Sequence, residues 1–260
     1  MHADVESLLP TSAHPSPCSH PPRESPPCEF PPCEFPPCGH SPRPRLVLVW
    51  TRGVDPFQMT RRQELSNAAS MALPSLAVLS VCIITSQLNI RISFLLLGSA
   101  LHFPASCAYH VSAALDRLPD RIDNDLRRLD QSYAHLVALV YIAALAPTNF
   151  AGAVLTCCAL AWNLLGVFSL WHASTANDGR RWRMLSVSAV MPVVPLAMQG
   201  HVNYSLALLL ICVLGGVPFI PPVNKRVFHG WGHTLFHVSL GMYAYVCALS
   251  ASTSPTDTHI

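Results

Sequence analysis

The sequence predicts an all-α membrane protein, a bundle of seven transmembrane helices with its N-terminus in the cytosol. Three observations lead to this fold class. Only 12% of the 260 residues are charged and 51% are hydrophobic, whereas a soluble domain carries about 25% charged residues. Seven apolar runs of helical length follow one another, and the basic residues fall in alternate connecting segments. The net charge of +2 gives no sign of a nucleic-acid partner.

Residues 1–63 are predicted to be a disordered, cytosolic leader rich in proline and cysteine. Its near-repeat PPCEF PPCEF PPCGH and more than half of the 24 prolines lie within residues 1–45, a composition that cannot build a packed core. The leader lacks the basic start and apolar core of a signal peptide. Its stretch LVLVW, 46–50, is too short to cross a bilayer.

Residues 64–250 are predicted to form the transmembrane domain, followed by a short tail, 251–260. Each apolar run has about 17 to 24 residues, the length at which a helix crosses ~30 Å of hydrocarbon. The fifth run is interrupted by Pro192 and Pro195, and a tight APTN turn predicts that the third and fourth form a hairpin. The predicted spans are 67–86, 92–115, 131–147, 149–172, 184–200, 203–220 and 232–250.

The distribution of Lys and Arg predicts the orientation. With the N-terminus inside, 15 of the 16 basic residues fall in cytosolic segments, and only Arg91 lies outside. This is a strong positive-inside bias. An even number of spans would break the alternation, so the charges also favour seven spans.

Polar residues within the predicted spans converge at one depth near the cytosolic face. Ser106 and His110 lie four apart, hence on one helical face, at the end of the second span. Asp130 opens the third span, and His233 and His237 lie one turn apart at the start of the seventh. The topology thus places three imidazoles and a carboxylate at the same level.

Three histidines are the usual protein ligands of a catalytic zinc ion, and a His–x–x–x–His pair supplies two of them from one helical face. We therefore predict a Zn²⁺ site with His110, His233 and His237 as ligands. Asp130 is expected to hold a water or act as a general base, and Ser106 to orient a ligand or donate to a developing oxyanion. The alternative is that these histidines hydrogen-bond between helices and only hold the bundle together.

Three further histidines are expected to lie outside the ligand set. His102, in mid-span, is expected to face a neighbouring helix. His135 lies one turn deeper than Asp130 and is a candidate to support the metal ligands. His229, in the segment PPVNKRVFHG, is expected to be a solvated loop residue.

Four short motifs resemble the progestin and adipoQ receptor / haemolysin III family, in a superfamily with alkaline ceramidases and myomaker-like proteins. They are RQELSNAAS, SCAYH, LDQSYAH and GHTLFHVSL, within a resemblance that covers about residues 64–250. It implies a seven-helix bundle with an intramembrane zinc site near the cytosolic face. The same histidines, 110, 233 and 237, would bind zinc, with Asp130 and Ser106 beside them.

The resemblance also assigns Glu64 and Asn67 to a Glu–x–x–Asn element, where Glu64 would tie the first span to its neighbours. Two details differ between branches of the superfamily. Met71 stands where haemolysin-type members carry a histidine, and MALPSLAVLS resembles the Leu–Pro element of the myomaker-like branch.

These features predict a zinc-dependent hydrolase of a lipid amide such as ceramide, with a ceramide-like or sphingolipid-like membrane lipid as its partner. Two alternatives stay open: a lipid-responsive receptor with a structural zinc site, and a myomaker-like membrane-remodelling protein. A pore is disfavoured because the fourth and sixth spans contain hardly any polar residues. The expected location is the plasma membrane or an endomembrane of the ER or Golgi.

Overall fold

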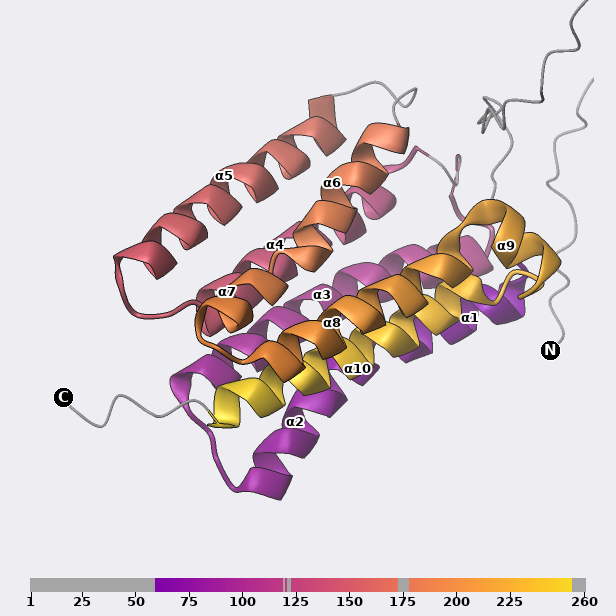
Figure 1. The fold of residues 1–260 in the computed structure, drawn as a ribbon. Helices are drawn as coiled ribbons and strands as arrows, with labels where there is room; N and C mark the ends of the chain where they lie inside the picture. Colours follow the sequence, from indigo (N-terminus) through magenta and orange to yellow (C-terminus); the bar gives the residue numbers. More distant parts are fainter. Residues whose placement is uncertain (1–58, 119, 121–122, 173–177, 254–260) are drawn as a thin grey trace, which may run out of the picture. The chain divides into compact units, whose positions relative to one another are not determined.

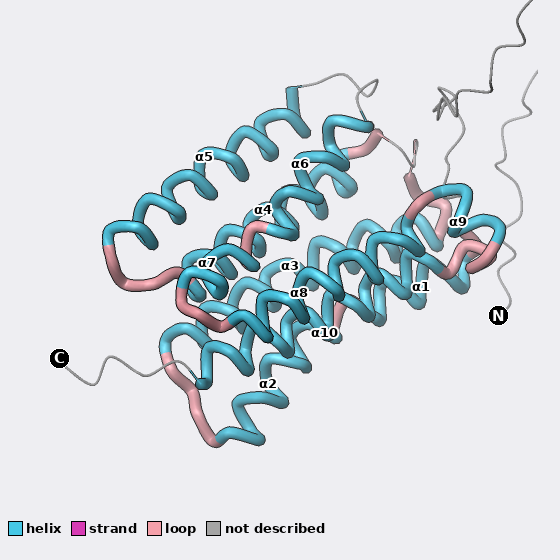
Figure 2. Tube along the Cα trace, in the orientation of Figure 1, coloured by secondary structure: helices cyan, strands magenta, loops and turns pink. Residues whose placement is uncertain are grey.

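The structure is a computed structural model that describes residues 59–118, 120, 123–172 and 178–253, all within one compact unit, Trp50–Ile260. Regular structure in these residues consists of α-helices and one short 3-10 helix, with no strand among them (Figures 1 and 2). The all-helical prediction is confirmed. The LVLVW segment and nearly all of the predicted leader lie outside the described residues, as does most of the tail.

The first predicted span consists of two helices, α1 (Arg61–Ser70) and α2 (Leu73–Thr85). The helical structure begins at Arg61 rather than at residue 67 because Thr60 and Gln63 form a capping box. Pro74 lies in the first turn of α2, where a missing N–H breaks no helical hydrogen bond. The interruption between the two helices makes α1 a separate short element with its own buried face.

The next three helices are α3 (Ile90–Ala114), α4 (Asp125–Leu145) and α5 (Phe150–His172), and of these α3 and α5 follow the predicted runs closely. Asn124 caps α4 by accepting a hydrogen bond from the Arg127 backbone N–H at 2.8 Å. The helix therefore begins six residues before the apolar run, inside a charged segment. The APTN turn joins α4 to α5, and the two helices pack together as a hairpin.

The fifth run forms α6 (Asp178–Val190) and α7 (Val193–Met198), separated at Met191 and Pro192. The sixth forms α8 (Val202–Gly216) and the 3-10 helix η2 (Val217–Phe219), and the seventh forms α10 (Gly232–Thr253). One prediction is corrected here. The PPVNKRVFHG segment is not all loop, because its proline-led start forms the short helix α9 (Pro221–Arg226).

Five helical segments are long and apolar enough to cross a membrane: Arg61–Thr85, Ile90–Ala114, Phe150–His172, Val202–Phe219 and Gly232–Thr253. Their outer surfaces carry many exposed apolar side chains, among them Ile83 and Ile84, each 71% exposed. A surface of this kind is expected against lipid rather than water. These five helices indicate a membrane protein. The start of α4 is charged and α6 is short, so neither is among the five.

The main apolar core lies where α2, α3, α4, α8 and α10 meet. It contains fully buried side chains such as Val78, Leu95, Leu145 and Leu208. At one end of this core, α1 packs against both α3 and α10, and α1 and α9 lie at that end of the bundle (Figure 1). The polar residues considered next are gathered where α1, α3 and α10 meet.

Candidate metal centre

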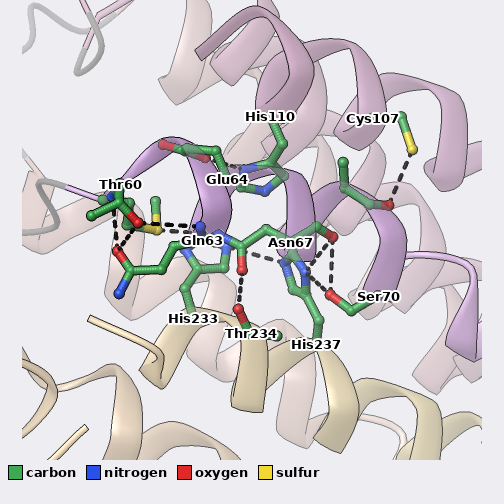
Figure 3. A network of polar contacts seen from close by, with 12 residues as sticks. Thr60, Gln63, Glu64, Asn67, Ser70, Cys107, His110, His233, Thr234 and His237 are labelled. Atoms are coloured by element: carbon green, nitrogen blue, oxygen red, sulfur yellow. Dashed lines mark hydrogen bonds and ion pairs between the residues drawn. The ribbon is translucent and has the colours of Figure 1, made fainter. Parts of the chain in front are cut away.

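Three imidazole rings from two helices meet beside α1. α3 carries His110, and α10 carries His233 and His237 one turn apart. The centroid of the His110 ring lies 5.0 Å from that of His233 and 5.4 Å from that of His237. One ring nitrogen from each histidine lies within 4.8 Å of the other two, close enough for all three to bind one metal ion. Figure 3 shows the three rings close together, with Glu64, Asn67 and Ser70 beside them.

Glu64 holds the outer side of the His110 ring. Its Oε2 lies 2.8 Å from His110 Nδ1, and both side chains are almost completely buried. An ionised carboxylate only accepts hydrogen bonds, so His110 Nδ1 carries the proton and Nε2 is left with a free lone pair. A carboxylate–histidine pair of this kind orients the ring and makes the opposite nitrogen a better metal ligand.

His237 is held in the same way by the backbone of α1. Its Nδ1 lies 3.1 Å from the carbonyl oxygen of Asn67 and 3.0 Å from Ser70 Oγ. Ser70 Oγ itself donates to the Asn67 carbonyl oxygen at 2.9 Å. The consistent assignment is therefore that His237 Nδ1–H donates to both oxygens. His237 Nε2, like that of His110, is then unprotonated and available to a ligand.

The free nitrogens of the cluster lack suitable partners within it. His110 Nε2 is buried with no hydrogen-bond partner, an arrangement that costs about 1–3 kcal/mol. The Nε2 atoms of His233 and His237 lie 3.0 Å apart. At most one proton can lie between that pair, and none satisfies His110. A divalent cation bound by all three nitrogens would resolve both features, so the donor set fits a metal ion.

The buried face of α1 builds the support for this cluster. Gln63, Glu64, Asn67 and Ser70 are all buried and recur at helical spacing. Thr234 on α10 donates to Asn67 Oδ1 at 2.6 Å, which fixes the α1 backbone against the helix that carries the histidine pair. This polar face needs a polar partner, and α10 and α3 supply it.

The loop before α10 is anchored by the same face of α1. Gln63 Nε2 donates to the carbonyl oxygen of His229 at 2.8 Å. His229 therefore contacts α1 through its backbone carbonyl. Gly230 follows with a φ of +90°, and a Cβ there would lie 2.6 Å from Gln63 Nε2. Glycine is suited to this position by both conformation and space.

The structure places Asp130 beside a histidine that was not predicted to belong to the site. Asp130 Oδ1 lies 3.0 Å from His102 Nε2, and among the described residues the ligand cluster itself contains only His110, His233 and His237. Ser106 is buried on the same face of α3 and faces Asp130, although its Oγ makes no hydrogen bond of standard geometry.

His135 does not support the cluster and belongs to a separate one. Its Nδ1 lies 2.9 Å from Asn163 Oδ1 on α5 and 3.2 Å from Ser188 Oγ on α6. Gly166 lies against the ring, because a Cβ there would be 2.4 Å from His135 Cε1. His135 was proposed as a supporting residue from its depth alone, without regard to the direction in which its side chain leaves the helix. The surface of α4 that carries His135 faces α5 and α6.

Sequence reasoning missed Ser70, Thr234 and the contact between His102 and Asp130. Ser70 continues the helical stripe that starts with Glu64 and Asn67, and Thr234 directly follows a predicted ligand. These spacings were available signals. The partner of Asp130 was not, because it depends on the register between two helices. Comparisons with family models, with curated proteins and with solved structures find no match to this chain.

Proposed function

We propose that the chain crosses the membrane seven times with its N-terminus in the cytosol, with α4 and the α6–α7 pair as the two further spans. The distribution of charge supports this topology. Arg61, Arg128 and Lys225 lie at the starts of α1 and α4 and in α9. Arg91 opens α3 about 28 Å from His110 along the helix axis. The basic residues therefore favour a cytosolic position for the end that carries the histidines.

We further propose that the ion is Zn²⁺. Three neutral imidazoles arranged around one point, with two of their Nδ1 atoms held by a carboxylate and a carbonyl, resemble catalytic zinc sites with one open position. Buried imidazole suits zinc better than the oxygen-seeking ions Ca²⁺ and Mg²⁺. The observation that carries the proposal is the convergence of three nitrogens, one of them buried and unpartnered.

The function that this centre supports best is hydrolysis of a lipid amide, such as the amide of a ceramide-like lipid. A bound zinc ion would polarise a carbonyl and lower the pKa of a water molecule. Asp130 would accept a proton near the cluster, and the hydroxyl of Ser106 would donate to the oxygen of the amide carbonyl. A lipid would reach these groups from within the bilayer. The resemblance to the haemolysin III and adipoQ receptor superfamily is part of this proposal.

The proposal is tested first by metal analysis. We expect the full chain, purified in detergent without added metal, to contain about one zinc per protein molecule by mass spectrometry. The His237→Ala variant should contain almost none. Wild-type protein without stoichiometric metal would contradict the proposal.

Activity is tested next, with short- and long-chain ceramides in mixed micelles and with release of fatty acid and sphingoid base measured by mass spectrometry. We expect amide hydrolysis by the wild type and none by His237→Ala. Zinc without hydrolysis would leave the receptor function with a structural zinc site. That result would separate the two candidates.

A further inference from the structure

We propose that His102 is the positioning residue of Asp130, and that proton transfer in the site depends on the pair rather than on Asp130 alone. The inference rests on the proposed hydrolase function. It starts from the 3.0 Å contact between His102 Nε2 and Asp130 Oδ1, the one ion-pair geometry that the structure gives for Asp130 in the described part of the chain.

The contact follows from spacing on α3. His102, Ser106 and His110 are four residues apart in turn and form one stripe on the helix. α4 packs closely along α3 and brings Asp130 to the end of this stripe that carries His102. One continuous line of side chains therefore leads from the metal cluster through Ser106 to the pair, over about 12 Å of helix.

The pair is partly exposed. The side chains of His102 and Asp130 keep 12% and 18% of their surface exposed, whereas His110 is completely buried. The carboxylate is thus more accessible than the His110 ring, as a group that exchanges protons with a substrate must be.

The chemistry of the contact assigns a role to each atom. An ionised carboxylate is costly in an apolar surrounding unless a donor satisfies it. His102 Nε2–H donates to Oδ1, which holds Asp130 in one orientation. Oδ2 is then the oxygen available for proton transfer.

During hydrolysis, the oxygen of water bonds to the amide carbonyl carbon and one water proton moves to Asp130. That proton passes to the amide nitrogen as the C–N bond breaks, releasing a carboxylic acid and an amine. His102 keeps its own proton throughout, so its role is to position the carboxylate.

Two substitutions separate positioning from packing. His102→Phe keeps the ring volume but removes the donor, whereas His102→Gln retains a donor amide. We expect His102→Phe to lower kcat about 10–100-fold, the usual effect of losing a group that orients a catalytic residue. KM and zinc content should stay unchanged, and His102→Gln should recover most of the rate. His172→Gln, an exposed histidine on α5, is the matched control.

A second measurement needs no substrate. In the full chain as purified in detergent and labelled with ¹⁵N-histidine, the His102 N–H signal should lie downfield in the wild type, as expected for a charge-assisted hydrogen bond. In Asp130→Asn the same signal should move upfield, because the charged acceptor is gone. If the His102 N–H chemical shift does not change in Asp130→Asn, the inference is overturned. A folded His102→Phe variant with the kcat of the wild type would overturn it too.

The two failures can be told apart. If wild-type protein binds zinc and hydrolyses the amide while His102→Phe is fully active, only the role of His102 fails. If wild-type protein neither binds zinc nor hydrolyses amides, both the proposed function and this inference are overturned. If His102→Phe fails to fold, His102→Gln and the NMR signal decide the outcome.

Discussion

Two buried clusters in this bundle are each built around histidine, and they differ in what the second ring nitrogen meets. In the cluster between α1, α3 and α10, Glu64 holds Nδ1 of His110, and Nε2 is buried without a partner. In the cluster between α4, α5 and α6, side chains hold Nδ1 of His135. Gly166 packs against the remaining edge of that ring.

The difference separates a histidine that could bind a metal ion from one that only holds helices together. In a structural cluster, polar partners and close packing use all the space around the ring, as Asn163, Ser188 and Gly166 do around His135. In a ligand cluster one nitrogen is held firmly, and the other points into a space shared with further lone pairs. His110 and His135 are both completely buried, so burial alone does not identify a metal site.

The largest expected effect comes from exchanging a histidine for alanine in each cluster. His237→Ala removes one of three ligands, so zinc affinity should fall by more than the roughly 100-fold expected for a supporting residue. His135→Ala should leave zinc content unchanged and lower thermal stability instead. Zinc per protein, measured by mass spectrometry, checks both. Loss of zinc in a folded His135→Ala variant would contradict the distinction between the two clusters.

Glu64→Gln should have the next largest effect. The amide can still contact His110 but no longer supplies a negative charge, so the ring nitrogen facing the metal becomes a weaker ligand. We expect zinc affinity to fall about 10–100-fold, measured by competition with a chromophoric chelator. Gln87→Glu, at an exposed position in the loop between α2 and α3, is the control for a Glu/Gln exchange and should leave affinity unchanged.

Gly166→Ala tests the packing of the second cluster. The new methyl group would lie 2.4 Å from His135 Cε1, so the ring or α5 must move. Overpacking of this kind costs about 1–3 kcal/mol, which a detergent melting curve detects as a lower Tm. Gly179→Ala is the control, because a Cβ there meets nothing within 4 Å. Equal melting temperatures in the two variants would contradict the packing described here.

The smallest effect is expected for Ser70→Ala. His237 Nδ1 would lose one of two acceptors, and the Asn67 carbonyl would still hold it. An interhelical hydrogen bond in a membrane contributes about 0.6 kcal/mol on average, so zinc affinity should fall by about threefold. The chelator competition above measures it. A loss as large as that of Glu64→Gln would show that the hydroxyl, rather than the carbonyl, orients His237.

Much of the helical layout could be predicted from hydropathy. α3 (Ile90–Ala114) and α5 (Phe150–His172) begin and end within about two residues of their apolar runs. Larger errors occurred where polar residues extend a helix. Thr60 and Asn124 cap α1 and α4 inside charged segments, and hydropathy does not register a capping hydrogen bond.

The pairing of His233 and His237 could also be predicted, because four-residue spacing on a helix places side chains on one face whatever the tertiary structure. His110 was added to them by the predicted topology, which put the end of the second span and the start of the seventh on the same side of the membrane. The contacts between Asp130 and His102 and between Glu64 and His110 depend on how neighbouring helices are rotated and shifted along their axes. A register change of one residue, about 1.5 Å and 100°, would replace each partner.

Local patterns in the chain were thus enough to predict most of its long helices, their apolar surfaces and the shared face of His233 and His237, because these depend on spacing along a single helix. Packing between helices decided which nitrogens are held, which one is left free, and that His135 belongs to another cluster. Those outcomes depend on distances of a few ångströms between residues far apart in the chain, which only the folded bundle determines.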